Sequence, residues 1–139
     1  MSARIFLDTN ILVYATITDS VGEKNAKALS FLESMERNRI FISTQVINEY
    51  YSTLIRKNVA DDIIQKKIRE LIEIVEVFPV DLPTVVYSWK VRERYGFSIW
   101  DSLIVATALK GRCTVLYSED LQHEQVIEKR VLVLNPFKM

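Results

Sequence analysis

Short apolar runs alternate with longer amphipathic stretches along this chain. Runs rich in β-branched and aromatic side chains predict strands at residues 4–7, 40–42, 75–78, 115–117 and 131–134. Stretches with helical periodicity separate most of these runs, so the strands must be joined by crossover connections rather than by tight turns. The pattern therefore predicts an α/β fold with a mainly parallel sheet and helices on both faces.

The stretches between the strands predict helices, and several of their ends carry recognisable signals. The expected helices span residues 11–16, 23–37, 44–57, 61–74, 83–94 and 99–110. Ser43 or Thr44 is a candidate N-cap for the third helix and Ser98 for the last one, whereas Gly96 and Gly111 mark helix ends. The last helix is apolar on nearly every side, so we expect it to be buried in the core.

Composition and charge narrow the class of protein. With 139 residues, 49% of them hydrophobic and 26% charged, the chain is expected to form a single globular domain, 1–139. The 18 basic and 18 acidic residues balance, which argues against loose, non-specific binding to nucleic acid. Cys113 is the only cysteine, and no apolar run approaches the roughly 18 residues of a membrane span or resembles a signal peptide. We therefore expect a cytoplasmic protein.

Four acidic residues stand where predicted elements begin or end. Asp8 and Asp120 follow strands, Asp101 opens the last helix, and Glu49 lies early in the helix at 44–57. Parallel strands bring their carboxyl ends to one edge of the sheet, where open α/β folds bind ligands. Like charges there repel by roughly 4 kcal/mol per pair at an effective dielectric constant of about 20, and a divalent cation bound through oxygen would remove the repulsion. These residues predict a metal-dependent site that cleaves phosphodiesters.

Two of the acidic positions also have a purely structural interpretation. Asp8 or Thr9 could be the N-cap of the helix that follows the first strand. Ser98 and Asp101 have the spacing of a capping box, in which Asp101 would only accept a hydrogen bond from a backbone amide. Because the last helix is expected to be buried, a carboxylate in its first turn would nonetheless lie in a deep crevice. Capping and chemistry can coexist at Asp101.

The other acidic positions are ambiguous as well. Glu49 falls on the flank of the apolar stripe of its helix, where a solvated glutamate is the commoner case. Glu119 and Asp120 could belong to a plain turn after a strand, and local pattern does not decide which of them points inward. His123 is the only histidine, and we expect it at the surface without a catalytic role. The catalytic interpretation therefore depends on the four acidic positions taken together.

Four segments together resemble the motifs of the PIN domain, in their usual order along the chain. They are residues 5–12, 48–49, 100–106 and 117–121. Their spacing and the chain length are most similar to those of VapC-type toxins of toxin–antitoxin systems. The resemblance implies a three-layer α/β/α fold and a ribonuclease that depends on Mg²⁺ or Mn²⁺.

The matching positions assign roles to individual side chains. The resemblance implies that the catalytic and metal-binding residues are Asp8, Glu49, Asp101 and Asp120, with Thr9, Asn10 and Ser118 as supporting residues. Carboxylates can hold metal ions but are poor nucleophiles, so we expect these residues to act as metal ligands. Among them, we expect Asp8 and Asp101 to be the most direct ligands. Asp120 would complete the site, and Glu49 would bind a second ion or position a water. The resemblance favours Asp120 over Glu119 and implies products with a 5′-phosphate and a 3′-hydroxyl.

Basic and aromatic side chains supply candidate contacts to RNA. The predicted helix before Asp101 carries three expected RNA-binding residues, Lys90, Arg92 and Arg94. A second basic group consists of Arg56, Lys57, Lys66, Lys67 and Arg69. For any single one of these cations, a solvated helix face is the commoner use. Aromatic residues that could stack on bases or pack in a dimer interface are Tyr14, Tyr50, Tyr51, Tyr87 and Trp89.

Together these features predict an endoribonuclease that is the toxin of a type II toxin–antitoxin pair. Its expected partners are RNA as substrate, an antitoxin protein, and a second copy of the chain in a homodimer. One alternative is a PIN-type nuclease in RNA processing or turnover without an antitoxin. Another is a non-catalytic RNA- or protein-binding module on the same fold, against which the intact acidic quartet argues.

Overall fold

Six strands form one sheet in the computed structural model, which describes residues 3–18 and 23–139. The strands are β1 (Arg4–Leu7), β2 (Arg39–Ser43), β3 (Glu76–Phe78), β4 (Val115–Tyr117), β5 (Val126–Ile127) and β6 (Val131–Leu134). Their order in the sheet is β3-β2-β1-β4-β6-β5, and every pairing is parallel except that of β5 with β6. The predicted α/β fold with a mainly parallel sheet is confirmed.

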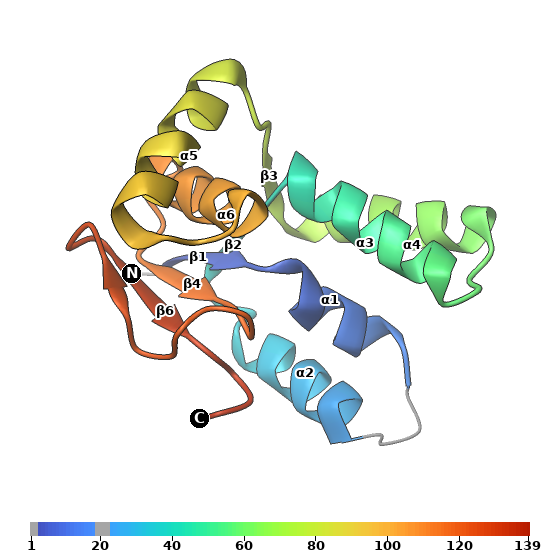
Figure 1. Ribbon diagram of the computed structural model, residues 1–139. Coiled ribbons are helices and arrows are strands. Elements are labelled where there is room, and N and C mark those ends of the chain that lie inside the picture. The colour runs from blue at the N-terminus through green and yellow to red at the C-terminus, as the bar shows by residue number, and fades with distance from the viewer. Residues whose placement is uncertain (1–2, 19–22) are drawn as a thin grey trace.

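Helices cover both faces of this sheet. They are α1 (Thr9–Thr16), α2 (Glu23–Ser34), α3 (Thr44–Arg56), α4 (Asp61–Ile74), α5 (Leu82–Tyr95) and α6 (Ile99–Lys110). Figure 1 shows α5 and α6 on one face, α1 and α2 on the other, and the pair formed by α3 and α4 extending to the side. Among the described residues, no helix has the length and apolar character needed to cross a membrane.

Local signals set most helix ends as the sequence predicts. The side chain of Ser43 accepts a hydrogen bond from the backbone amide of Val46, and that of Ser98 accepts one from Asp101. Gly96 ends α5 with φ of 76°, a left-handed conformation that glycine adopts without a steric penalty. The predicted elements match within a few residues, with two differences. The helix expected at 23–37 ends at Ser34, and β5 was not predicted because a two-residue antiparallel edge strand has no periodicity to detect.

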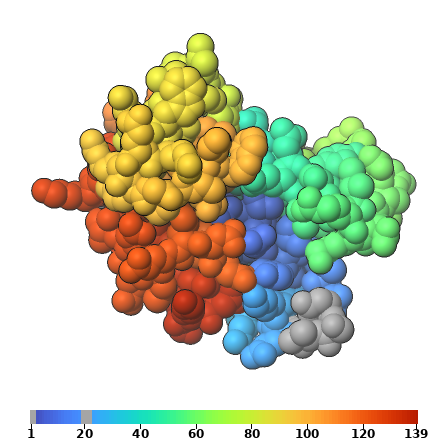
Figure 2. All heavy atoms as spheres, viewed as in Figure 1, coloured from blue at the N-terminus to red at the C-terminus, as the bar shows by residue number. Residues whose placement is uncertain are grey.

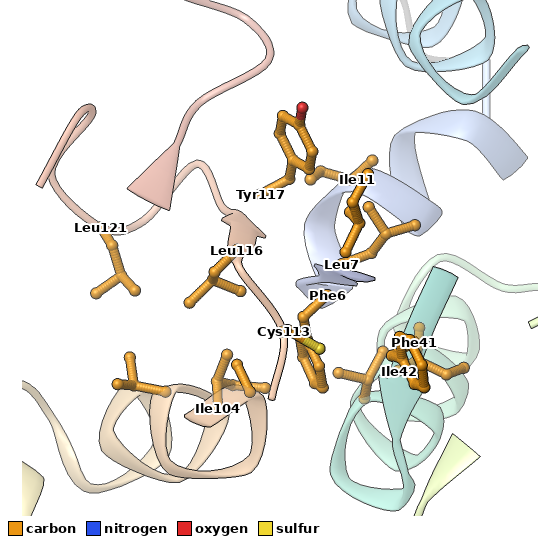
Figure 3. Close-up of a cluster of buried hydrophobic side chains, with 14 of the residues drawn as sticks. Phe6, Leu7, Ile11, Phe41, Ile42, Ile104, Cys113, Leu116, Tyr117 and Leu121 are labelled. Carbon is orange, nitrogen blue, oxygen red and sulfur yellow. The ribbon is translucent and has the colours of Figure 1, made fainter. Parts of the chain in front are cut away.

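The core lies on both faces of β1, because successive side chains of a strand point in opposite directions. Figure 3 shows Phe6 directed toward α6 and Ile104, whereas Leu7 is directed toward α1 and Ile11. All four side chains are at most 2% exposed. Burial from both sides explains why this strand reads as a continuous apolar run rather than an alternating one.

The expectation that α6 is buried throughout is wrong for its first turn. The residues from Ile104 to Leu109 are buried, but Ile99 is 56% exposed and Trp100 is 64% exposed. The apolar pattern around this helix cannot distinguish the two regions, because burial depends on which turns other elements cover. Two large apolar side chains therefore stand in solvent where α6 begins.

Candidate active site

Asp8 lies at the carboxyl end of β1, next to the end of β4. Leu7 pairs in register with Tyr117, and the Asp8 amide donates to the Tyr117 carbonyl at 3.0 Å, which extends the parallel ladder by one residue. The Asp8 carboxylate accepts from the Thr9 amide at 2.7 Å and from the Ser118 hydroxyl at 2.8 Å. Asp8 is thus the N-cap of α1, and its side chain is buried at the edge of the sheet.

Three carboxylates converge at this edge. Asp8, Asp101 and Asp120 each offer one oxygen atom, and these atoms all lie within 4.8 Å of one another. Asp101 comes from the first turn of α6, and Asp120 from the loop after β4. The side-chain amide of Asn10 donates to Asp120 at 3.1 Å, and the Asp120 backbone amide donates to the Ser118 hydroxyl at 3.2 Å. Chain segments about a hundred residues apart in sequence therefore build one acidic cluster.

Glu49 lies beside this cluster rather than within it. Its carboxylate accepts from the Thr9 hydroxyl at 2.7 Å and, at 3.4 Å, from the side-chain amide of Gln45. Glu49 is half-buried, because α3 packs against α1. It is therefore held in place by neighbours and is not the freely solvated glutamate that its position on the helix flank would suggest.

Burial and mutual repulsion make the acidic cluster electrostatically unfavourable. Burial raises the pKa of Asp8 to about 7, against the lowering effect of its hydrogen bonds from Ser118 and Thr9. Burial also raises the pKa of Asp101, and the charge of Glu49 adds to that effect. For Asp120 burial is again the main reason for a raised pKa, followed by the charge of Asp101. All three carboxylates of the cluster are thus destabilised in their charged form.

Neighbouring Glu119 has a different role from Asp120. Its carboxylate forms an ion pair with Lys24 at 2.7 Å and accepts from the Tyr14 hydroxyl at 3.3 Å. It is therefore directed toward α1 and α2, away from the acidic cluster. This geometry agrees with the choice of Asp120, rather than Glu119, as the inward-facing residue.

The acidic cluster stands in a cleft of about 810 Å³, a volume typical of ligand sites. In Figure 2, blue atoms of the amino-terminal segment are visible between the teal atoms of α3 and the orange atoms of the carboxyl-terminal part. The α3 side of the cleft is polar and includes Gln45, Asn48, Ser52, Thr53 and Arg56. These residues recur at helical spacing on the flank opposite Leu54 and the rest of the buried stripe of α3, a signal that could have identified them from the sequence.

The cations near the cleft differ from those singled out in the sequence. Arg56 is the only basic residue among the described residues that line the cleft. Lys90, Arg92 and Arg94 do not line it. Arg92 donates to the Phe97 carbonyl, and Arg94 is paired with a glutamate near the carboxyl terminus. Within the second basic group, Arg56 is therefore the member placed to meet a ligand in the cleft.

Several aromatic residues and the histidine serve packing. Tyr50 is 3% exposed and belongs to the core, so it cannot stack on a base. The ring of Tyr14 packs edge-on against Phe137, with 5.3 Å between ring centroids. His123 is half-buried, and its Nδ1 atom accepts from the Asn135 amide at 2.9 Å. Trp100, which was not singled out, lines the cleft.

The chain is similar to a known protein family and to several solved structures. The model of the PIN domain family matches residues 5–129. Among curated proteins, no sequence matches the chain. Solved structures that share the fold include VapC20 of Mycobacterium tuberculosis, a Sarcin-Ricin loop cleaving toxin, with 20% identity, a TM-score of 0.70, and 84% of this chain and 89% of that chain covered.

Two complexes of toxin with antitoxin are similar over nearly their whole length. VapBC2 from Rickettsia felis, bound to a DNA fragment from its promoter, has 22% identity and a TM-score of 0.68 over 95% of this chain and 98% of that one. A toxin–antitoxin complex from Klebsiella pneumoniae has 20% identity and a TM-score of 0.70 over 97% of this chain and 98% of that one. At these identities the likeness establishes a common fold.

Proposed function

The chain belongs to the PIN domain family, and on this premise we propose that residues 1–139 form one metal-dependent endoribonuclease domain, the toxin of a type II toxin–antitoxin pair. The observation that carries the proposal is the convergence of Asp8, Asp101 and Asp120 within 4.8 Å at the carboxyl ends of β1 and β4. Their raised pKa values argue that the cluster costs folding free energy. Such a cost is typical of a site kept for chemistry.

The donor set fits Mg²⁺ or Mn²⁺. All ligand atoms are carboxylate oxygens, which hard divalent cations prefer. One oxygen atom from each of Asp8, Asp101 and Asp120 lies within 4.8 Å of the others, so these residues would be able to hold one divalent ion together. We assign Asp8 and Asp101 as direct ligands, Asp120 as the residue that completes the site, and Glu49 as ligand of a second ion or as orienter of water. When bound, the metal lowers the pKa of a coordinated water and offsets charge on the phosphoryl oxygens.

The surrounding side chains hold these carboxylates in position. Ser118 and the Thr9 amide donate to opposite oxygens of Asp8, which restricts rotation of its carboxylate. The Thr9 hydroxyl orients Glu49, and the Asn10 amide holds Asp120. These three supporting residues therefore act by positioning acidic groups in the cleft, and the expected products carry a 5′-phosphate and a 3′-hydroxyl.

The proposed reaction is tested by cleavage of a panel of structured RNAs with the purified chain. We expect cleavage with Mg²⁺ or Mn²⁺, none with EDTA, and recovery when metal is added back. The control is the Asp8→Asn variant purified in the same way, which should be inactive under all conditions. Cleavage in EDTA by the wild type, absent from the variant preparation, would overturn the metal mechanism.

The proposed partner is an antitoxin that silences the acidic cluster in the cytoplasm. An antitoxin arginine could pair with Asp8, Asp101 or Asp120, because guanidinium and carboxylate groups form two parallel hydrogen bonds. Expression of the chain alone should slow growth of its host, and Asp8→Asn should relieve this toxicity. Normal growth with abundant wild-type protein would instead favour a nuclease of RNA processing. A homodimer remains part of the proposal, to be measured by sedimentation.

A further inference from the structure

Trp100 presents a large aromatic surface to the cleft. Its side chain is 64% exposed and lines the cleft together with Asp101, the next residue in the chain. Among the described residues that line this cleft, Trp100 is the only aromatic one, and most of the others are polar or acidic. Tryptophan side chains are mostly buried in folded proteins. The large exposed fraction of Trp100 in an acidic cleft therefore needs an explanation.

The backbone beneath this ring is fixed from two sides. The carbonyl of Trp100 accepts a hydrogen bond from the side-chain amide of Gln45 at 3.1 Å, which ties the first turn of α6 to α3. The Ser98 side chain caps the same turn by accepting from the Asp101 amide at 3.0 Å. The helix turn that carries the indole is therefore anchored on two sides, which limits the backbone entropy lost when a ligand covers the ring.

We propose that Trp100 stacks on an unpaired nucleobase next to the scissile phosphate and thereby holds the RNA strand in the cleft. This inference rests on the proposed function, because it assumes a phosphate at the cluster of Asp8, Asp101 and Asp120. The bases flanking such a phosphate lie within one nucleotide of it, and Trp100 lines the same cleft as the three carboxylates. An aromatic ring can stack on a base only when that base is free of its own helical stack.

A protein partner is the competing occupant of this surface, since Ile99 beside Trp100 is also 56% exposed. The position of Trp100 in the same cleft as the carboxylates favours a nucleic acid. Asn48 and Ser52 of α3, which line the same cleft, offer hydrogen-bonding groups suited to the sugar and phosphate rather than a second apolar surface. Stacking would also tolerate any base, because every base has a π-face.

The chain contains two tryptophans, Trp89 and Trp100, and thereby offers its own matched control. Trp89 is 55% exposed, lies on α5 and does not line the cleft. In an Asp8→Asn background that stops cleavage, Trp89→Phe leaves Trp100 as the only tryptophan, and Trp100→Phe leaves Trp89. Each protein is titrated with a short randomised single-stranded RNA and with a blunt-ended duplex of the same length while tryptophan fluorescence is recorded.

Single-stranded RNA should quench the fluorescence of Trp100 and leave that of Trp89 unchanged, and the duplex should quench neither. Trp100→Ala should weaken binding of the single strand by about 5- to 140-fold, the usual effect of losing one stack. Trp100→Phe should recover most of this loss, because it restores an aromatic face. Trp89→Ala should bind like the parent protein.

Equal quenching at both tryptophans, or unchanged binding in Trp100→Ala, would overturn the inference. The inference would also be overturned if the fluorescence of Trp100 changed with protein concentration in the absence of RNA but did not change when RNA was added. That result would assign the surface to a protein contact. Failure of the proposed function is distinguishable from these results. In that case the wild type would cleave no RNA with Mg²⁺ or Mn²⁺, whatever the fluorescence of Trp100 shows.

Discussion

Carboxylates occur in two contrasting settings in this molecule, the acidic cleft and the corner where α5 meets the turn between β5 and β6. At the corner, Glu128 pairs with Arg94 and accepts from the Tyr95 hydroxyl at 2.9 Å. The hydrogen bond from Arg94, followed by that from Tyr95, lowers the pKa of Glu128. In the cleft, burial raises the pKa of Asp8 to about 7, and its charged neighbours are also acidic.

The contrast separates residues that maintain the fold from residues kept for chemistry. Glu128 and Lys129 form the turn, and their φ angles are 53° and 56°. This left-handed conformation is unfavourable for residues other than glycine, asparagine and aspartate. The contacts of Glu128 with α5 hold this turn in place. In the cleft, by contrast, none of the ion pairs among the described residues involves Asp8, Asp101 or Asp120, and Arg56 is the only basic residue among the described lining residues. The corner stabilises the fold, and the cleft costs stability.

The largest expected effect on RNA cleavage comes from neutralising Asp101 in the cleft. Asp101→Asn should reduce RNA cleavage by at least about a hundredfold, because loss of a group that merely orients a metal ligand already costs about 10- to 100-fold. Its melting temperature without metal should be unchanged or higher, since repulsion is relieved while the Ser98 cap depends only on the backbone amide. Cleavage rates and thermal unfolding measure the two effects.

Glu128→Gln is the matched control for this substitution. It should leave cleavage unchanged and lower the melting temperature, because the pair with Arg94 is lost at the strained turn. If Asp101→Asn instead unfolds the protein while the remaining folded fraction keeps normal specific activity, Asp101 has only a capping role.

The stability of the metal-free protein should fall as pH rises. The pKa of Asp8 is raised from 3.8 to about 7, so between these values the folded state binds more protons than the unfolded state. The contribution of Asp8 to the free energy of unfolding is greatest below about pH 4 and decreases by a few kcal/mol as pH rises through about 7. Urea unfolding in EDTA at several pH values measures the slope, and Asp8→Asn should flatten it. Equal slopes in both proteins would contradict the assignment.

Arginine substitutions test which cations meet RNA. Arg56→Ala should weaken binding of single-stranded RNA severalfold for all sequences and reduce the slope of log affinity against log salt by about 0.7, the loss of one phosphate contact. Arg94→Ala should leave binding unchanged, because this side chain is paired with Glu128 outside the cleft. Salt-dependent binding assays compare the two variants. The reverse result would restore the basic residues of α5 as the RNA contact.

The smallest effect is expected at Glu119, next to Asp120 in sequence. Glu119→Gln should keep cleavage within about twofold of the wild type, because its carboxylate is engaged by Lys24 and Tyr14 outside the acidic cluster. Asp120→Asn, in contrast, should behave like Asp101→Asn. Parallel cleavage assays of both variants decide between them, and a large loss in Glu119→Gln would place Glu119 in the site.

The sequence by itself determined the elements of the fold and the positions of the acidic residues along them. Strand and helix periods, the caps at Ser43 and Ser98, and the stop at Gly96 depend on neighbours a few residues away, so they can be read locally. A parallel sheet follows from crossover connections, and with it the meeting of Asp8 and Asp120 at one edge.

Only the tertiary structure decided how these residues are used. The hydrogen bond from Ser118 to Asp8 joins residues 110 positions apart, and Lys24 of α2 draws Glu119 out of the site. The exposure of Trp100 likewise depends on which parts of α6 are covered by elements distant in sequence. Such outcomes depend on the path of the whole chain, because burial, charge pairing and access to the cleft are set by groups distant in sequence.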